Sequence, residues 1–183
     1  MKELSLNILD ITENSIKAQA TLVEILIEET EQVLTLMIKD DGCGMDYDTV
    51  NKVTDPFYTT RTTRKVGFGV PFLKLAAEQT GGGIEIQSCR QNENSAEHGT
   101  VIKAVFMKNH IDFVPLGDIC STVITLIQGS CEIDFVFDHK LPTGEVTIDT
   151  RQLRQVLGDV PLSSFEVITW IKEYLAEQYE NVK

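Results

Sequence analysis

A chain of 183 residues with 42 % apolar residues has the length of one domain with a small appendage and enough apolar side chains for a packed core. Its formal net charge of −12 argues against a general nucleic-acid binder, which needs a basic surface. No apolar run reaches the ~18 residues of a membrane span, and the first residues lack the pattern of a signal peptide. We therefore expect a cytoplasmic protein with no membrane partner.

The charge and the cysteines also limit the ligands. An acidic surface repels phosphates, so a site for a phosphorylated ligand has to gather positive charge locally. The four cysteines are far apart in the chain and form no Cys-x-x-Cys pair, and no histidine lies near them at metal-ligand spacing. This pattern argues against zinc and favours reduced thiols.

The chain opens with a predicted helix over residues 3–20, in which apolar residues recur at helical spacing from Leu4 to Ile11. Asp10, Asn14 and Lys17 follow at i, i+4 and i+7, so they share a narrow face roughly opposite the apolar stripe. An amide oxygen can bind a hard cation such as Mg²⁺, and an ammonium group can meet a phosphate. A solvated helix face is the alternative interpretation.

Two strands are predicted next, over residues 20–29 and 32–40, as an antiparallel pair. The second strand ends on Asp40, and Gly42 and Gly44 follow at once. A buried carboxylate is costly unless something donates a hydrogen bond to it, which an exocyclic amine of a base would do. The alternatives are therefore an acidic turn and a ligand lying against a bare backbone. A short helix is predicted over residues 46–52.

A loop without hydrophobic period follows over residues 54–69. It gathers Arg61, Arg64 and Lys65 just before Gly67 and Gly69, and a helix is predicted to begin at Pro71. Basic side chains, glycines and the amides at a helix start together suit a phosphate. The alternative is a flexible surface loop with a glycine hinge.

The predicted helix ends at glycines 81–83, and two more strands follow over residues 83–89 and 99–107. These elements predict an α/β (α+β) two-layer sandwich with helices on one face of a mostly antiparallel mixed sheet. We expect this first domain to cover residues 1–108.

Residues 109–183 are expected to form a C-terminal α+β extension, packed on or near the first domain. A hairpin is predicted over residues 122–138 around Gly129-Ser130, and a short strand over 141–149. Two helices follow over residues 150–158 and 163–180, the second beginning with a capping box of Ser163 and Glu166.

Four segments together resemble one family in order and spacing. They are "DITENSIKAQAT", "IKDDGCGMD", "DPFYTTRTTRKVGFGVPFLKLAAEQTGG" and "HGTVIKAVF". The family is the superfamily of gyrase, heat-shock chaperone, histidine kinase and MutL ATPases (GHKL). The first two segments are most similar to MutL and the third to a sensor histidine kinase. The resemblance covers about residues 3–107, and it implies binding of ATP and Mg²⁺.

The resemblance also implies roles for single residues. At the base end, Asp40 matches the aspartate that binds the adenine amino group, Gly42 and Gly44 shape the pocket, and Thr100 lies behind the adenine.

At the phosphate end, Asn14 matches the Mg²⁺-holding asparagine and Lys17 a phosphate contact. Gly67 and Gly69 match the glycines at the phosphates, within or beside a lid over residues 55–68.

The chain departs from the family at the catalytic position. Hydrolytic members usually carry glutamate as the base where this chain has Asp10, which is one methylene shorter. Glu13 is the second candidate, about 60° round the helix. No histidine lies in a phosphoacceptor pattern, and we expect His98, His110 and His139 to be surface residues.

Two classes of function follow. The first is an Mg–ATP-binding protein that acts with a separate protein partner, as a histidine-kinase-like or anti-sigma-kinase-like ATPase or kinase working in trans. The second is a non-catalytic module that senses ATP or regulates by interaction. Turnover distinguishes them, because only the first releases ADP or transfers phosphate. We expect no nucleic acid as partner, and the sequence leaves a homodimer open.

Overall fold

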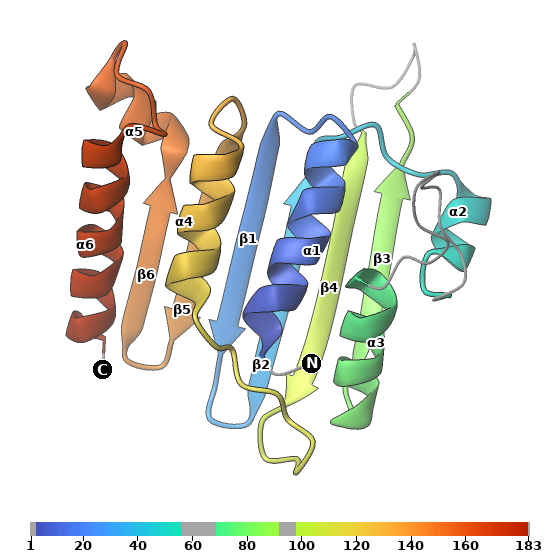
Figure 1. Ribbon diagram of the computed structural model, residues 1–183. Coiled ribbons are helices and arrows are strands. Elements are labelled where there is room, and N and C mark those ends of the chain that lie inside the picture. Colours follow the sequence, from blue (N-terminus) through green and yellow to red (C-terminus); the bar gives the residue numbers. More distant parts are fainter. Residues whose placement is uncertain (1–2, 56–68, 92–97, 183) are drawn as a thin grey trace.

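The computed structural model describes residues 3–55, 69–91 and 98–182. Its centre is one six-stranded sheet in the order β3-β4-β2-β1-β5-β6 (Figure 1). The strands are β1 (Leu22–Glu29), β2 (Val33–Asp40), β3 (Gly83–Cys89), β4 (Gly99–Met107), β5 (Asp134–Leu141) and β6 (Gly144–Asp149). The helices are α1 (Leu4–Lys17), α2 (Tyr47–Lys52), α3 (Gly69–Gln79), α4 (Ile119–Gly129), α5 (Thr150–Leu157) and α6 (Phe165–Asn181).

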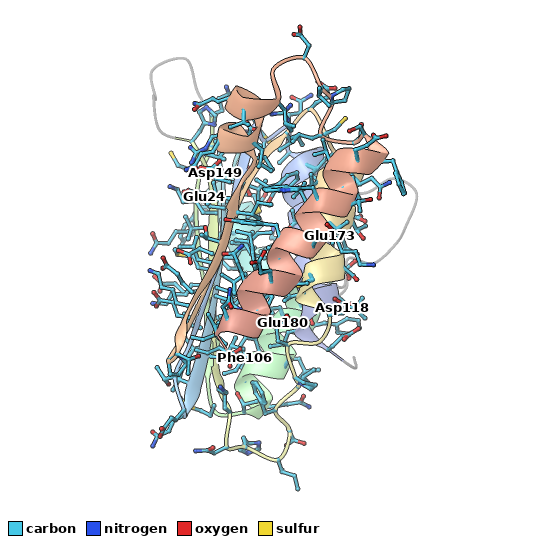
Figure 2. The ribbon with its side chains drawn as sticks, turned by 90° about the vertical axis from the view of Figure 1, so that its left-hand side faces the viewer. Glu24, Phe106, Asp118, Asp149, Glu173 and Glu180 are labelled. Atoms are coloured by element: carbon cyan, nitrogen blue, oxygen red, sulfur yellow. The ribbon has the colours of Figure 1, made fainter. Side chains whose placement is uncertain are left out.

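The four longest helices, α1, α3, α4 and α6, cover one face of the sheet (Figure 1). Figure 2 views the sheet along its plane, with these helices on one side and Glu24 on the other face. The alternation along β1 explains the layers, since Val23, Ile25 and Ile27 are at most 1 % exposed while Glu24 is only partly buried. All neighbouring strands are antiparallel except β1 and β5. The predicted two-layer α/β sandwich with a mostly antiparallel mixed sheet is confirmed.

Residues 109–182 extend both layers. Strand β5 pairs with β1 in parallel, with Val23 opposite Phe135, and β6 adds the edge strand. Helix α4 packs between α1 and α6 (Figure 1). One apolar core contains buried residues from both parts, for example Ile8 and Val123. The boundary near residue 108 stays a prediction, because the sheet crosses it without a break.

The predicted hairpin over residues 122–138 is wrong in its first half, which is helix α4. Its buried residues Ile119, Val123, Leu126 and Ile127 recur at helical spacing and face α1 and α6. Asp118 caps the helix, because its Oδ1 accepts a hydrogen bond from the Ser121 amide at 2.9 Å. The β-branched composition favoured a strand, but burial between two helices outweighs that propensity.

Two helix starts also differ from prediction. Helix α3 begins at Gly69 and not at Pro71, which still lies in the first turn, where an amide hydrogen is not needed. Helix α6 has Ser164 as its N-cap without a side-chain cap bond, so the capping box of Ser163 and Glu166 is wrong. The other predicted helices and strands are confirmed to within a few residues.

Among the described residues, no helix is both long and apolar enough to cross a bilayer.

Candidate functional site

Helix α1 turns a polar edge toward the start of α3. Asp10, Asn14 and Lys17 are exposed, while the opposite side of the helix is buried against the sheet. A Cβ atom placed on Gly69 would lie 3.4 Å from the Asp10 Cβ and 3.7 Å from the Asn14 Nδ2. The structure therefore brings three predicted site residues together, with the first turn of α3 against the carboxylate and amide of α1. Amides at a helix start favour anions.

Lys17 and Glu13 contact each other. Their Nζ and Oε2 atoms are 2.8 Å apart, and both side chains are about half exposed. An exposed pair at i, i+4 adds little to stability, so it can open when a stronger anion arrives. Glu13 is thus paired with Lys17, and Asp10 is the carboxylate that lies beside Gly69.

Asp40 forms the floor of the site at the end of β2. It is 9 % exposed. Its Oδ2 accepts a hydrogen bond from the Ser15 hydroxyl at 2.6 Å, and its Oδ1 accepts one from the Gly42 amide at 2.9 Å. These two donors offset part of the cost of burying a carboxylate, and an ionised carboxylate has about four accepting positions. The group thus has the chemistry to accept a further hydrogen bond from an amino group.

Ser15 is a site residue that sequence reasoning missed. Its position one residue after Asn14 places it on the buried side of α1, where it is 4 % exposed. The sequence did contain a signal for this position. Ser15 lies seven residues after the apolar Ile8, and this spacing in a helix predicts that both side chains face inward.

Gly42 and Gly44 bring the turn close to other parts of the backbone. Gly44 has a φ of +65°, and a Cβ there would lie 1.9 Å from the carbonyl oxygen of Cys89. A Cβ on Gly42 would lie 2.9 Å from the Cβ of Ala18. The glycines therefore let the turn pack against the ends of β3 and α1. Their contact with a bound base stays a prediction.

Asp41 ties the same turn to β1. Its carboxylate accepts hydrogen bonds from the amide and hydroxyl of Thr21 at 2.7 and 2.5 Å, and from the amide of Leu22 at 2.9 Å. Burial raises the pKa of Asp41, but these hydrogen bonds outweigh it and lower that pKa below its ordinary value of 3.8. This aspartate is thus engaged in structure and Asp40 is the candidate for binding.

Thr100 lies directly beside Asp40 on the neighbouring strand. Its hydroxyl is 2.9 Å from the hydroxyl of Ser88, which also accepts a hydrogen bond from the Met45 amide at 2.8 Å. Ser88 is a second residue that the sequence did not reveal. It joins the ends of β3 and β4 to the segment that follows Gly44.

The three histidines differ in environment. His110 is exposed as predicted, 3.5 Å from Asp112. His98 is partly buried, and its Nδ1 lies 2.8 Å from the carbonyl oxygen of Gly42. His139 is 2 % exposed, so the prediction of a surface residue is wrong there. Strand β5 continues through His139 to Leu141, and its alternation places the imidazole in the core.

Part of the predicted phosphate cradle lies outside the described residues. This applies to Arg61, Arg64, Lys65 and Gly67, and to the predicted lid except Asp55. The described part of the predicted site therefore comprises Asp40 and Thr100, which are predicted to lie at the base, and the helix edge with Asp10 and Asn14.

Comparison with known proteins identifies relatives of this arrangement. Residues 2–110 match the model of the family described as "Histidine kinase-, DNA gyrase B-, and HSP90-like ATPase". A probable C4-dicarboxylate sensor kinase of Bacillus subtilis is 27 % identical over 92 residues, which are 50 % of this chain and 16 % of the relative. The sensor histidine kinase YvrG of the same organism is 30 % identical over 101 residues, which are 52 % of this chain and 16 % of the relative.

A solved structure shares the fold over more of the chain. The MutL ATPase domain of Aquifex aeolicus, complexed with ADP, aligns with a TM-score of 0.56 and 14 % identity over 86 % of this chain and 69 % of its own. The likeness in fold thus extends beyond residues 2–110. By contrast, the chain spans about a sixth of the length of the curated relatives it matches.

Proposed function

The chain belongs to the family of histidine kinase-, DNA gyrase B- and HSP90-like ATPases, and from that membership we propose that it binds Mg²⁺–ATP across the ends of α1, β2 and α3. One observation carries the proposal. A buried Asp40 and an exposed Asp10–Asn14 edge beside Gly69 both adjoin helix α1, because Asp40 is hydrogen-bonded to Ser15, the residue that follows Asn14.

The base end of the site would recognise an amino group. Asp40 would accept a hydrogen bond from the adenine amino group, because a carboxylate held by Ser15 and Gly42 has accepting positions left. Thr100 is paired with Asp40 on the neighbouring strand and would lie behind the base.

The phosphate end would neutralise charge. The amide oxygen of Asn14 suits a hard cation, and the first amides of α3 suit an anion. Mg²⁺ held there would screen the negative charge of the phosphates. Lys17 would exchange Glu13 for a phosphate oxygen, because their exposed pair is weak. Arg61, Arg64, Lys65 and Gly67 would complete the cradle, as the family resemblance implies.

Asp10 is the proposed general base for turnover. It lies beside Gly69 at the start of α3, and this position supports Asp10 over Glu13. The shorter aspartate has to reach a water molecule that glutamate would meet more directly. We therefore expect slow hydrolysis, and faster phosphate transfer when a protein partner supplies the acceptor.

The partner is proposed from the kind of relative. Both curated relatives named above are sensor kinases, and kinase activity in trans by a cytoplasmic protein, alone or as a homodimer, is the corresponding role for this chain. The alternative is an ATP-sensing module without turnover, which is favoured by the aspartate at position 10 and by the pairing of Lys17 with Glu13.

Calorimetric titration with ATP, with and without Mg²⁺, tests the proposal. Wild type is expected to bind with micromolar affinity, and Asp40→Asn to lose at least about tenfold, because asparagine has one accepting oxygen where the carboxylate has two and its NH2 group cannot accept a hydrogen bond. Asn14→Ala should bind independently of Mg²⁺. ADP release should occur with wild type and stop with Asp10→Asn, although Asp10→Asn still binds.

The matched control is Asp48→Asn, a change in an exposed carboxylate of α2 that should leave binding unchanged. Binding without ADP release, alone or with candidate protein partners, would support the sensing module. No heat from wild type at millimolar ATP would refute nucleotide binding.

A further inference from the structure

A histidine outside the predicted site holds the turn that follows Asp40. The Nδ1 atom of His98 lies 2.8 Å from the carbonyl oxygen of Gly42. Because a carbonyl oxygen only accepts, Nδ1 must carry the hydrogen and donate it. The imidazole is partly buried, so water competes weakly with this bond.

Gly42 is therefore held through both of its backbone groups. Its amide donates to Asp40 Oδ1 at 2.9 Å, and its carbonyl accepts from His98. The orientation of the Gly42 backbone thus decides whether one carboxylate oxygen of Asp40 keeps its donor. The same peptide group is also held by the Cys43 amide, which donates to the Ala18 carbonyl oxygen at 2.9 Å. Loss of the His98 bond would therefore loosen this peptide without releasing it, and glycine resists rotation less than any other residue.

The adjoining residues explain how His98 reaches Gly42. Gly99 has a φ of +121°, and a Cβ there would lie 2.0 Å from the carbonyl oxygen of Asp40. Thr100 then pairs with Asp40 in the sheet. The run from His98 to Thr100 consequently lies directly against Asp40 and Gly42, with the histidine at its outer end.

We propose that His98 is a positioning residue that holds the Gly42 turn and so fixes Asp40 for an adenine amino group. The inference rests on the proposed nucleotide function. Guanine presents a carbonyl oxygen where adenine has its amino group, and a fixed carboxylate rejects it because neither group can donate. His98 thereby sets the preference for ATP over GTP.

Three substitutions at His98 distinguish the hydrogen bond to Gly42 from a general effect on folding. His98→Asn puts an amide nitrogen at the same bond distance from Cα as Nδ1, and so retains the donor. His98→Gln puts it at the distance of Nε2, and His98→Ala removes it. His110→Ala is the control, because His110 is an exposed histidine away from the turn.

We expect His98→Ala and His98→Gln to lower the affinity for ATP about tenfold, while GTP affinity changes less, so the preference for ATP falls. His98→Asn and His110→Ala should keep both affinities within about twofold. A purely structural role would lower both affinities together and leave their ratio unchanged. The proposal would be overturned if wild type and His98→Ala had the same ratio of ATP affinity to GTP affinity. It would also be overturned if the Asn and Gln variants had the same affinities for ATP and GTP.

Amide hydrogen exchange provides a measurement that does not need nucleotide. Exchange over residues 40–45 should accelerate in the Ala and Gln variants and not in the Asn variant. If wild type binds no nucleotide but this pattern holds, the proposed function fails and the turn-holding role stands. If ATP binds and exchange is the same in all variants, His98 does not hold the turn and the inference is refuted.

Discussion

At the scale of single residues, Gly44 beside the site and Gly81 just after α3 are constrained for different reasons. Gly44 combines a positive φ with a close contact to the carbonyl of Cys89, whereas Gly81 has a φ of +84° and open space around it. Gly83 has neither constraint. The three positions allow backbone strain and steric overlap to be separated in one protein.

Gly44→Ala should lower the free energy of unfolding by more than about 2 kcal/mol, because the backbone must move to clear an overlap at 1.9 Å and alanine also resists a positive φ. Gly81→Ala should cost about 1 kcal/mol from the φ angle alone, and Gly83→Ala less than that. Urea unfolding monitored by circular dichroism gives all three values. Equal losses in the free energy of unfolding for Gly44→Ala and Gly81→Ala would show that the turn at Gly44 moves away from Cys89 at no additional cost.

The sequence and the family resemblance predicted Asp10, Asn14, Asp40 and Gly69 as parts of one site, and the structure places Gly69 beside Asp10 and Asn14, and Asp40 beside Ser15. The supporting hydroxyls and the imidazole could not be predicted in the same way. Which serine or histidine meets a given carboxylate or carbonyl depends on the packing of distant segments. Ser15 and His98 are 25 and 56 positions away from their partners Asp40 and Gly42.

At the scale of elements, hydrophobic periodicity was sufficient to predict the helices and strands that bury one face. The alternation in β1 and β2 and the stripe in α1 predicted these elements correctly. In α4 the helical spacing was present too, but β-branched residues and a Gly-Ser pair favoured a hairpin. Contacts with α1 and α6 decide the outcome, and they are not visible in a local window.

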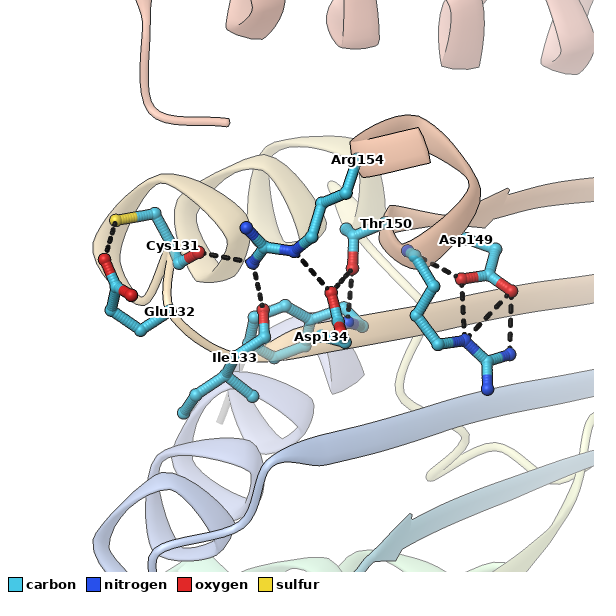
Figure 3. A network of polar contacts seen from close by, with 9 residues as sticks. Cys131, Glu132, Ile133, Asp134, Asp149, Thr150 and Arg154 are labelled. Carbon is cyan, nitrogen blue, oxygen red and sulfur yellow. Dashed lines mark hydrogen bonds and ion pairs between the residues drawn. The ribbon is translucent and has the colours of Figure 1, made fainter. Parts of the chain in front are cut away.

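Helix α5 is fastened to the start of β5 by a cluster of polar contacts (Figure 3). The Thr150 hydroxyl donates to Asp134 Oδ1 at 2.9 Å and accepts from the Phe135 amide at 2.8 Å. Arg154 donates to the same Asp134 oxygen at 2.7 Å and to the carbonyl of Cys131. Thr150 is fully buried, so its two bonds are protected from water.

Thr150→Val should lower the free energy of unfolding by about 2 kcal/mol, because valine fills the same space and leaves the buried Phe135 amide without its acceptor. Thr125→Val is the control. Its hydroxyl also bonds to protein, at 2.7 Å from the Ser121 carbonyl, but on an exposed helix face, so the change should be below about 0.5 kcal/mol. Thermal unfolding of both variants provides the comparison, and equal stabilities would contradict the proposed role of the cluster.

At the scale of the whole molecule, a mostly buried network joins the two predicted parts of the chain. Glu29 at the end of β1 contacts Lys108 at 2.5 Å and His139 of β5 at 3.1 Å. His139 in turn lies 2.7 Å from the Tyr179 hydroxyl of α6. Residues on both sides of position 108 are thus held around one carboxylate, and this contact supplements the pairing of β1 with β5.

The charge on Glu29 links this network to pH. The hydrogen bond from His139, together with Lys108 and against the opposing effect of burial, lowers the pKa of Glu29 from 4.5 to about 2. A carboxyl group whose pKa is lowered by folding stabilises the protein above its ordinary pKa and loses that contribution as the pH falls. The Glu29 contribution is therefore complete above about pH 4.5 and disappears toward pH 2, and it amounts to at most about 3 kcal/mol.

Glu29→Gln should remove this contribution, so the variant loses stability at neutral pH and its stability falls less than that of wild type between pH 4.5 and pH 2. Glu28→Gln is the matched control, because Glu28 is 59 % exposed and pairs only loosely with Lys140 at 3.4 Å. Urea unfolding at a series of pH values measures both variants against wild type. Parallel pH profiles for wild type and Glu29→Gln would show that the network does not depend on the Glu29 charge. Convergence of the two profiles at low pH would instead locate the acid sensitivity of the junction at this carboxylate.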